Sequence, residues 1–227
     1  MGTLGGRHTG IGMTSDRTRT RMVERLRRDG IRDEVVLSAL NAVPRHIFVD
    51  EALASRAYDD VPLPIGHGQT ISQPWVVARM TELARNGRAL DTILEIGTGC
   101  GYQTAVLARV GVTVFTVERI HALVIKARRN LQALKVGNVR LKYGDGSADL
   151  KEDIAVDAIV IAAGATHVPT ALFRYLKPAG RMVLPLAASG DEERGTQRLT
   201  VIEATAGGMR EHTYDAVRFV PLLSGLS

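Results

Sequence analysis

Ile93-Leu94-Glu95-Ile96-Gly97-Thr98-Gly99-Cys100-Gly101 runs from an apolar strand into a glycine-rich turn. Because Gly97, Gly99 and Gly101 have no side chains, the chain can turn sharply here and bring bare backbone amides to the start of the next helix. A parallel sheet presents backbone amides to a ligand in this way. A tight strand-to-helix turn without a ligand would have the same sequence, so other residues must decide between the two interpretations.

Strands and helices alternate on the carboxyl side of this turn. Segments rich in Val and Ile, separated by helical segments, indicate an α/β fold with a parallel sheet covered on both faces. No helix is predicted between the last two strands, and Gly207-Gly208 lies between them, so they should form an antiparallel hairpin. The predicted strands are 92–96, 112–118, 139–143, 156–162, 180–186, 197–205 and 209–220, and the helices among them are 101–110, 120–134 and 169–176.

Two short helices are predicted on the amino side of the turn, at 17–29 and 33–42, because apolar residues recur there near helical spacing. They should form a small helical cap over the sheet. Residues 1–15 are rich in glycine and polar groups and are expected to be a flexible tail. We therefore expect a single domain over 16–227, with the cap and a binding loop in 16–75 and a Rossmann-like core in 76–227.

Composition limits the class of protein. The 227 residues suffice for one α/β domain with a sizeable core, and 45% of them are hydrophobic. No apolar run approaches the roughly 20 residues of a membrane helix, and the first residues lack the apolar segment of a secretory signal. Cys100 is the single cysteine and has no partner for an internal disulfide. These features predict a cytoplasmic protein that does not span a membrane.

The formal net charge of +5 comes mostly from seven arginines and three acids between Asp16 and Arg32. A nucleic-acid-binding protein usually spreads basic residues along a whole face, whereas this cluster alternates with Glu24 and Asp29 on a predicted helix. We expect a solvated helix and no nucleic-acid partner. The alternative is an RNA-modifying enzyme, which would bind RNA in a salt-sensitive way that depends on residues 1–32.

A nucleoside pocket is indicated by Glu118, which ends the second predicted strand, where a carboxylate can accept both hydroxyls of a ribose. A dinucleotide enzyme would prefer glycine at the position of the bulky Tyr102, which counts against NAD and FAD. S-adenosylmethionine has no phosphate and needs only amides for its carboxylate and an acid nearby. Glu95 could contact its ammonium group, and the carboxylate of Asp145 in Asp145-Gly146 could accept the adenine amino hydrogens beside a glycine that leaves the ring room. An ordinary Asp-Gly turn is the alternative for this last pair.

The segment before the core, Val61-Pro62-Leu63-Pro64-Ile65-Gly66-His67-Gly68-Gln69-Thr70-Ile71-Ser72-Gln73-Pro74, combines prolines, glycines and short polar side chains. We expect a loop that holds a substrate. Ser72 also precedes a helix start at Gln73, Pro74 and Trp75, where a hydroxyl could cap free amides and proline suits the first turn. Ser72 could therefore contact a substrate, cap the helix, or do both.

With these motifs in this order, the chain resembles the protein-L-isoaspartate (D-aspartate) O-methyltransferases, which are class I S-adenosylmethionine-dependent enzymes. The resemblance runs from about Arg21 to Gly225. It rests on Leu63-Pro64-Ile65-Gly66, Gln69-Thr70-Ile71-Ser72-Gln73-Pro74, Leu94-Glu95-Ile96-Gly97-Thr98-Gly99, Tyr102-Gln103, Leu176-Lys177-Pro178 with Gly180-Arg181, and Phe219-Val220-Pro221-Leu222. The chain departs from the pattern at Cys100, where serine is usual, and at residues 163–166, where an alanine pair followed by proline is expected.

The resemblance implies a seven-stranded, mostly parallel sheet and repair of damaged proteins by methylation of L-isoaspartyl residues. It implies that Ser72 is the active-site serine and that Gln69, Thr70, Ile71 and Ser72 border the cofactor. The substrate would be framed by Pro64, Ile65 and Gly66 together with Val220, Pro221 and Leu222. Glu95, Gly97, Gly99, Gly101, Glu118, Asp145 and Gly146 complete the predicted cofactor site.

The implied reaction moves a methyl group from a sulfonium to a carboxylate. Because the carboxylate is already ionised, no general base is needed, and alignment of the two reactants should dominate catalysis. His67 and His167 are therefore expected to be solvated rather than catalytic. No metal-ligand spacing appears, and a monomer is expected. A module that binds S-adenosylmethionine without transferring its methyl group is the remaining alternative.

Overall fold

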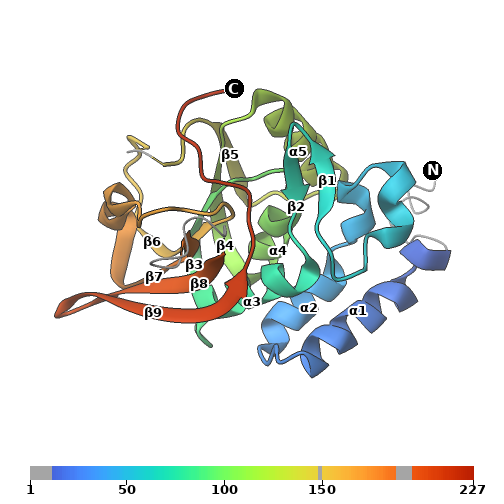
Figure 1. Ribbon diagram of the computed structural model, residues 1–227, viewed down its shortest axis with the longest axis horizontal. Coiled ribbons are helices and arrows are strands. Elements are labelled where there is room, and N and C mark those ends of the chain that lie inside the picture. Colours follow the sequence, from blue (N-terminus) through green and yellow to red (C-terminus); the bar gives the residue numbers. More distant parts are fainter. Residues whose placement is uncertain (1–11, 148–149, 188–195) are drawn as a thin grey trace.

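We describe residues 12–147, 150–187 and 196–227 from a computed structural model of the protein (Figure 1). A seven-stranded sheet forms the centre, in the order β5-β4-β3-β6-β7-β8-β9. The first five of these strands in that order are parallel, and β8 and β9 pair antiparallel to β7 and to each other, so the predicted sheet and hairpin are confirmed. The strands are β3 (Leu90–Ile96), β4 (Gly111–Glu118), β5 (Val139–Tyr143), β6 (Val156–Ile161), β7 (Leu176–Ala187), β8 (Gln197–Thr205) and β9 (Gly208–Val217).

Neighbouring strand residues alternate between two hydrophobic layers, as the two-residue repeat of a β-strand requires. Ile93, Val160 and Val183 face the layer that contains α3 (Pro74–Arg85), α4 (Tyr102–Val110) and α5 (His121–Ala133). Leu94 and Ile159 face the opposite layer, where Leu172 and Tyr175 of the 3-10 helix η4 (Thr170–Tyr175) pack. The predicted helix 169–176 is therefore a short 3-10 helix, and β7 begins four residues earlier than expected.

The amino-terminal cap packs on the α3 and α4 side of the sheet (Figure 1). Its helices are α1 (Asp16–Arg28) and α2 (Glu34–Ala42), followed by the 3-10 helices η2 (Arg45–Phe48) and η3 (Glu51–Arg56). Of the predicted tail, residues 1–11 lie outside the described part of the chain. The rest is ordered into the cap, because Gly12–Thr14 form the 3-10 helix η1 and the Ser15 hydroxyl accepts a hydrogen bond from the Thr18 amide.

One buried arginine joins the cap to the core. Arg45 is fully buried, and its Nε donates to the Ala57 carbonyl at 2.8 Å. Its guanidinium lies 4.7 Å from the centre of the Tyr102 ring, at the first residue of α4. Burial lowers the pKa of Arg45. A cation over an aromatic face is favourable in such a dry environment, so Arg45 links the cap to the helix that follows the glycine turn.

The segment predicted as a binding loop folds into a short antiparallel hairpin, β1 (Leu63–Gly66) and β2 (Gln69–Ile71), which leads into α3. His67 and Gly68 form its two-residue turn with φ values of 54° and 68°. Positive φ at both central residues is typical of a type I′ turn, which matches the twist of the flanking strands. The hairpin thus carries Gln69 to Ser72 toward the carboxyl ends of the sheet strands.

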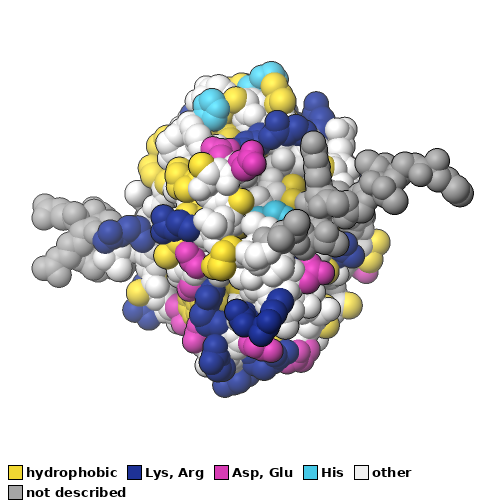
Figure 2. Space-filling view, turned by 90° about the vertical axis from the view of Figure 1, so that its right-hand side faces the viewer, with side chains coloured by type: hydrophobic (Ala, Val, Ile, Leu, Met, Phe, Trp, Pro, Cys, Tyr) yellow, Lys and Arg dark blue, Asp and Glu magenta, His cyan; other side chains and the backbone are white. Residues whose placement is uncertain are grey.

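Within the described residues, no helix is both long enough and apolar enough to cross a bilayer. The basic residues of α1 are interspersed with acids: Arg27 pairs with Glu34 and Arg19 pairs with Asp16. The space-filling view likewise shows Lys and Arg side chains interspersed with Asp and Glu on the face that it presents (Figure 2). The described part of this cluster is therefore a partly neutralised, solvated surface.

Candidate active site

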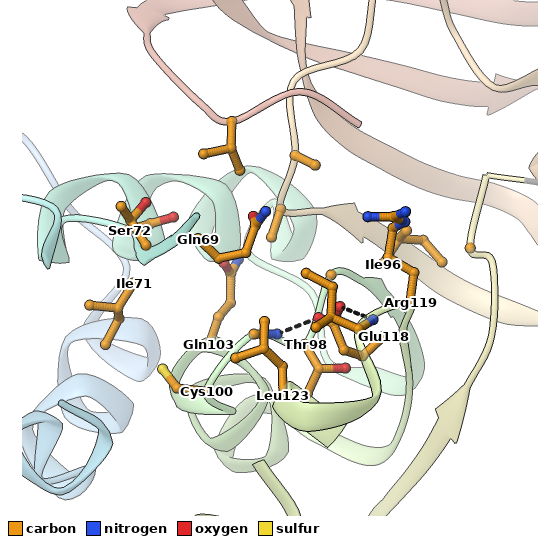
Figure 3. Close-up of a pocket in the computed structure, with 18 of the residues that line it drawn as sticks. Gln69, Ile71, Ser72, Ile96, Thr98, Cys100, Gln103, Glu118, Arg119 and Leu123 are labelled. Carbon is orange, nitrogen blue, oxygen red and sulfur yellow. Dashed lines mark hydrogen bonds between the residues drawn. The ribbon is translucent and has the colours of Figure 1, made fainter. Parts of the chain in front are cut away.

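A pocket lies at the carboxyl ends of β3, β4 and β6, where parallel α/β sheets bind their ligands (Figure 3). The parts of the chain that meet there include the glycine turn, the end of β4, the hairpin and the C-terminal segment. The lining residues include Gln69, Thr70, Ile71, Ser72, Gly97, Thr98, Gly99, Cys100, Gln103, Glu118, Arg119, Gly146, Val220, Pro221 and Leu222.

The glycine turn is shaped as the sequence predicted. Gly97, Gly99 and Gly101 have φ values of 91°, 57° and 91°, which favour glycine. Gly97 and Gly99 line the pocket, whereas Gly101 caps the amino end of α4 and is not among the lining residues. Gly101 thus shapes the turn from behind the pocket rather than lining it.

Glu118 has a role that the sequence did not reveal. Its Oε2 accepts the Gly99 amide at 2.8 Å and its Oε1 accepts the Ile120 amide at 2.9 Å, as the dashed lines show (Figure 3). The carboxylate is 5% exposed and lines the pocket. Since a carboxylate oxygen can accept more than one hydrogen bond, Glu118 can hold the glycine turn and still accept hydrogen bonds from a ligand.

Glu95 does not occupy the position that was predicted for it. It is fully buried, it is not among the residues that line the pocket, and its Oε2 accepts hydrogen bonds from Thr104 and Thr116 at 2.5 and 2.6 Å. Burial raises its pKa to about 7. The expected direct contact with an ammonium group is therefore not supported. The Thr116 hydroxyl also lies 2.6 Å from the Thr98 hydroxyl, so Glu95 supports the glycine turn from below.

Asp145 and Gly146 differ in position. Gly146 lines the pocket, and a Cβ built on it would lie 2.5 Å from Ile96 Cγ2, so glycine is required there for space. Asp145 is not a lining residue, because its Oδ1 accepts from the Ser147 amide and its Oδ2 accepts from the Gly225 amide. Asp145 thus shapes the turn and anchors the C-terminal tail, which is closer to the alternative interpretation of an ordinary Asp-Gly turn.

The hairpin contributes one of its two strands to the pocket. Gln69, Thr70, Ile71 and Ser72 are lining residues, as predicted for the cofactor border, but Pro64, Ile65 and Gly66 are not. Ile65 is 3% exposed and its Cδ1 lies 3.3 Å from where a Gly99 Cβ would be. Ile65 therefore packs under the glycine turn, and the predicted substrate contact of Pro64 to Gly66 finds no support in this arrangement.

Ser72 is not the cap of α3. The cap position is Gln73, whose side chain makes no cap hydrogen bond, and the Trp75 amide instead donates to Asp60 Oδ1 at 2.8 Å. The capping role predicted for Ser72 is therefore wrong. Ser72 lines both the pocket and an adjoining groove, whose other residues include Pro62, Trp75, Ala216, Arg218 and Phe219.

The lining also includes Gln103, Arg119 and Cys100, which were not among the predicted site residues. Gln103 is 7% exposed, and its Nε2 is buried with no hydrogen-bond partner among the described residues. Arg119 donates from Nε to the Gly225 carbonyl at 2.8 Å and thus joins the end of β4 to the C-terminal tail. Cys100 is buried, and burial raises the pKa of its thiol to about 11, which disfavours the reactive thiolate. The Tyr102-Gln103 motif in the sequence could have indicated that Gln103 belongs to the pocket.

The predicted C-terminal residues Val220, Pro221 and Leu222 do line the pocket. His67 lies exposed at the hairpin turn, and His167 lies exposed beside Thr166. Neither histidine is among the pocket residues. In the three described stretches of chain, no group of His, Cys, Asp and Glu has the arrangement of a metal site.

The pocket fits S-adenosylmethionine. Glu118 offers acceptor capacity for ribose hydroxyls, the glycines that line the pocket leave room for a ligand, and Gln103 Nε2 offers a donor with no partner among the described residues. S-adenosylmethionine has no pyrophosphate, so the pocket needs no cluster of basic groups to bind one. Tyr102 occupies the position where a dinucleotide enzyme has glycine.

Comparisons with known proteins agree with this fit. A family model described as protein-L-isoaspartate(D-aspartate) O-methyltransferase matches residues 17–227. Protein-L-isoaspartate O-methyltransferases from Dechloromonas aromatica and Chromobacterium violaceum are both 58% identical, covering 95% and 94% of this chain and 98% and 94% of their own.

A solved protein from Plasmodium falciparum, assigned as a protein-L-isoaspartate O-methyltransferase and in complex with S-adenosyl-L-homocysteine, is 26% identical with a TM-score of 0.74. The matched region covers 90% of this chain and 98% of the Plasmodium falciparum chain. A further solved protein-L-isoaspartate O-methyltransferase is 27% identical with a TM-score of 0.80, over 92% of this chain and 67% of its own. The chain therefore belongs to the protein-L-isoaspartate(D-aspartate) O-methyltransferase family, with the α/β fold of class I S-adenosylmethionine-dependent methyltransferases.

Proposed function

We propose that this protein-L-isoaspartate O-methyltransferase carries out methyl transfer at the junction of the pocket and the groove, with Ser72 beside the reacting carboxylate. S-adenosylmethionine supplies the methyl group. Glu118 would hold the ribose, and Gln69 to Ser72 would border the cofactor. The position of Ser72 supports this assignment most, because Ser72 lines both the pocket and the groove. Its hydroxyl is not needed to cap α3, since Asp60 accepts the hydrogen bond from the Trp75 amide.

The chemistry requires positioning more than proton transfer. The isoaspartyl carboxylate is ionised at neutral pH, so no residue has to remove a proton from it. Holding two reactants in line can supply about 7 to 11 kcal/mol of the barrier reduction. The charges on the carboxylate and the sulfonium disappear in the transition state, so a pocket that excludes water favours transfer once the carboxylate is aligned.

Ser72 would donate a hydrogen bond to one carboxylate oxygen. The bond would replace part of the hydration that the carboxylate loses on entering the pocket, and it would direct the other oxygen toward the methyl group. No hydrogen bond from the Ser72 hydroxyl is found among the described residues, and its side chain is half-buried. The Ser72 hydroxyl can therefore donate to the substrate without first breaking another hydrogen bond.

The groove beside Ser72 suits an extended peptide. Its lining combines apolar residues, among them Pro62, Trp75 and Phe219, with the polar residues Gln73, Thr196 and Arg218. Thr70, Ser72 and Val220 belong to both the groove and the pocket. A polypeptide in the groove would thus place one side chain at the mouth of the pocket.

Substitution of Ser72 and Asp60 separates catalysis from capping. Ser72→Ala should slow turnover on an isoaspartyl peptide by roughly ten- to a hundredfold, which corresponds to loss of a hydrogen bond to a charged group. It should change the free energy of unfolding by less than about 0.5 kcal/mol, since no cap is lost. Asp60→Ala is the matched control and should cost about 1 kcal/mol of stability with turnover little changed.

Initial rates and chemical denaturation of the two variants provide the test. Normal turnover in folded Ser72→Ala would remove Ser72 from the mechanism. A stability loss in Ser72→Ala equal to that in Asp60→Ala would show that Ser72 acts as a cap after all.

We further propose that the enzyme works as a cytoplasmic monomer without a nucleic-acid or membrane partner. The buried, unpaired thiol of Cys100 suits a reducing compartment. Two arginines of α1, Arg19 and Arg27, pair with Asp16 and Glu34, which reduces the positive charge that this helix offers to a phosphate backbone. The edge strands β5 and β9 carry charged residues, Arg140 and Lys142 on one and Arg210 and Glu211 on the other, which oppose edge-to-edge pairing.

A further inference from the structure

The C-terminal segment Phe219–Leu222 is held at the pocket by residues that are far away in the sequence. The Gly164 amide donates to the Val220 carbonyl at 2.8 Å, and the Leu222 amide donates to the Gly164 carbonyl at 2.7 Å. The next residue, Ala165, pairs with β7 through Pro185 and Ala187. The backbone after β6 therefore joins the segment to the main sheet.

A side chain extends this pairing beyond the end of the last strand. Gln197, the first residue of β8, pairs with Val217, the last residue of β9. Its side-chain amide reaches two residues further, where Oε1 accepts the Phe219 amide at 2.7 Å and Nε2 donates to the Phe219 carbonyl at 3.3 Å. The Gln197 amide thus satisfies both backbone groups of Phe219 in place of a neighbouring strand.

Gly164 provides the space that this arrangement needs. A Cβ built on Gly164 would lie 2.3 Å from Gln197 Nε2 and 2.7 Å from its Cδ, which is closer than real atoms approach. Gly164 is not among the residues with positive φ, so its backbone conformation does not require glycine. Space for the Gln197 side chain is therefore the physical reason for glycine at this position.

We infer that Gln197 is a positioning residue for substrate binding: it fixes Phe219 and the following residues so that the wall shared by the pocket and the groove is already formed when the peptide arrives. Phe219 and Val220 border the groove, and Val220, Pro221 and Leu222 line the pocket. Preforming a binding wall removes the ordering cost from the binding step. This inference rests on the proposed function, because it concerns the peptide that the groove would hold.

The test is a double-mutant cycle with Gln197→Ala and Gly164→Ala. Each single substitution should raise KM for an isoaspartyl peptide about tenfold, as expected for loss of two ordinary hydrogen bonds, while kcat falls less than threefold. Gly164→Ala acts by displacing the Gln197 side chain, so the double variant should be no worse than either single one. Gln197→Glu keeps the acceptor for the Phe219 amide but loses the donor, and its KM should be intermediate.

Hydrogen exchange gives a readout that does not depend on activity. The amides of Phe219 and Leu222 should exchange faster in the single variants than in the wild type. Gly137→Ala is the matched control, since a Cβ there meets nothing within 4 Å and its φ is not positive, and it should change neither KM nor exchange.

Additive effects in the double variant, or an unchanged KM in a folded Gln197→Ala or Gln197→Glu protein, would overturn the inference. Failure of the wild type to methylate the peptide would instead contradict the proposed function, and exchange would still report on the Gln197 contact.

Discussion

At the scale of single residues, the acids of this site divide into one that faces the pocket and one that lies beneath it. Glu118 lines the pocket and accepts two backbone amides, whereas Glu95 is buried under the turn and accepts two threonine hydroxyls. The sequence assigned both to the cofactor, Glu118 to the ribose and Glu95 to the ammonium group, and did not reveal that Glu95 lies outside the pocket lining. Their roles depend on which way a side chain points at the end of a strand and on threonines that lie 9 and 21 residues from Glu95 in the chain.

Glu95 should make the stability of the protein depend on pH. Burial raises the pKa of its carboxyl from 4.5 in the unfolded chain to about 7 in the folded protein. Between these values the folded state holds a proton that the unfolded chain has lost, so this group makes the free energy of unfolding fall as pH rises, and its effect levels off above about pH 7. The full effect is at most on the order of 3 kcal/mol.

Glu95→Gln should remove this dependence. Denaturation of the variant and the wild type at several pH values from 5 to 8 should show the variant gaining stability relative to the wild type as pH rises. Glu51→Gln, on the exposed helix η3, is the control for loss of one carboxyl group. Parallel stability curves for wild type and Glu95→Gln would contradict the buried, proton-retaining carboxyl.

At the scale of elements, the sequence predicted best those strands whose pattern is visible in neighbouring residues. The strands 139–143 and 197–205 were predicted at their observed bounds, because alternating burial and glycine punctuation are visible in the sequence. The hairpin β1–β2 and the pairing of Gly164 with Pro221 were not predicted. Both depend on which segments meet in space, and the second joins residues 57 positions apart. The glycine turn was recognised, but the sequence did not reveal that Gly101 caps α4 or that Ile65 is buried beside the turn, and neither residue lines the pocket.

The hairpin turn offers a prediction about His67. His67 and Gly68 both have positive φ, and Asn-Gly is the preferred pair for a type I′ turn. His67→Asn should therefore keep or raise stability by up to about 1 kcal/mol and leave kcat unchanged, since the exposed His67 is not a pocket residue. Thermal unfolding and steady-state rates measure both effects. A large fall in kcat with intact stability would give His67 a catalytic role that this account denies.

At the scale of the whole molecule, the charged edge strands support the proposed monomer. Charged residues on β5 and β9 should keep the chain a monomer, so sedimentation equilibrium at micromolar concentration should give a mass near 24.5 kDa. A mass near twice this value that persists on dilution would contradict the proposal. Added RNA should leave the sedimentation unchanged at physiological salt, because Arg19 and Arg27 of α1 are paired with acids.

The fold places the cofactor pocket and the adjoining groove so that they meet at Ser72, and the central claim is that this junction recognises isoaspartate. The most direct measurement supplies labelled S-adenosylmethionine and two peptides of one sequence that differ only in having isoaspartate or aspartate at a single position. The account predicts label in the isoaspartyl peptide alone. Equal labelling of both peptides, or labelling of neither while the protein binds the cofactor, would contradict it.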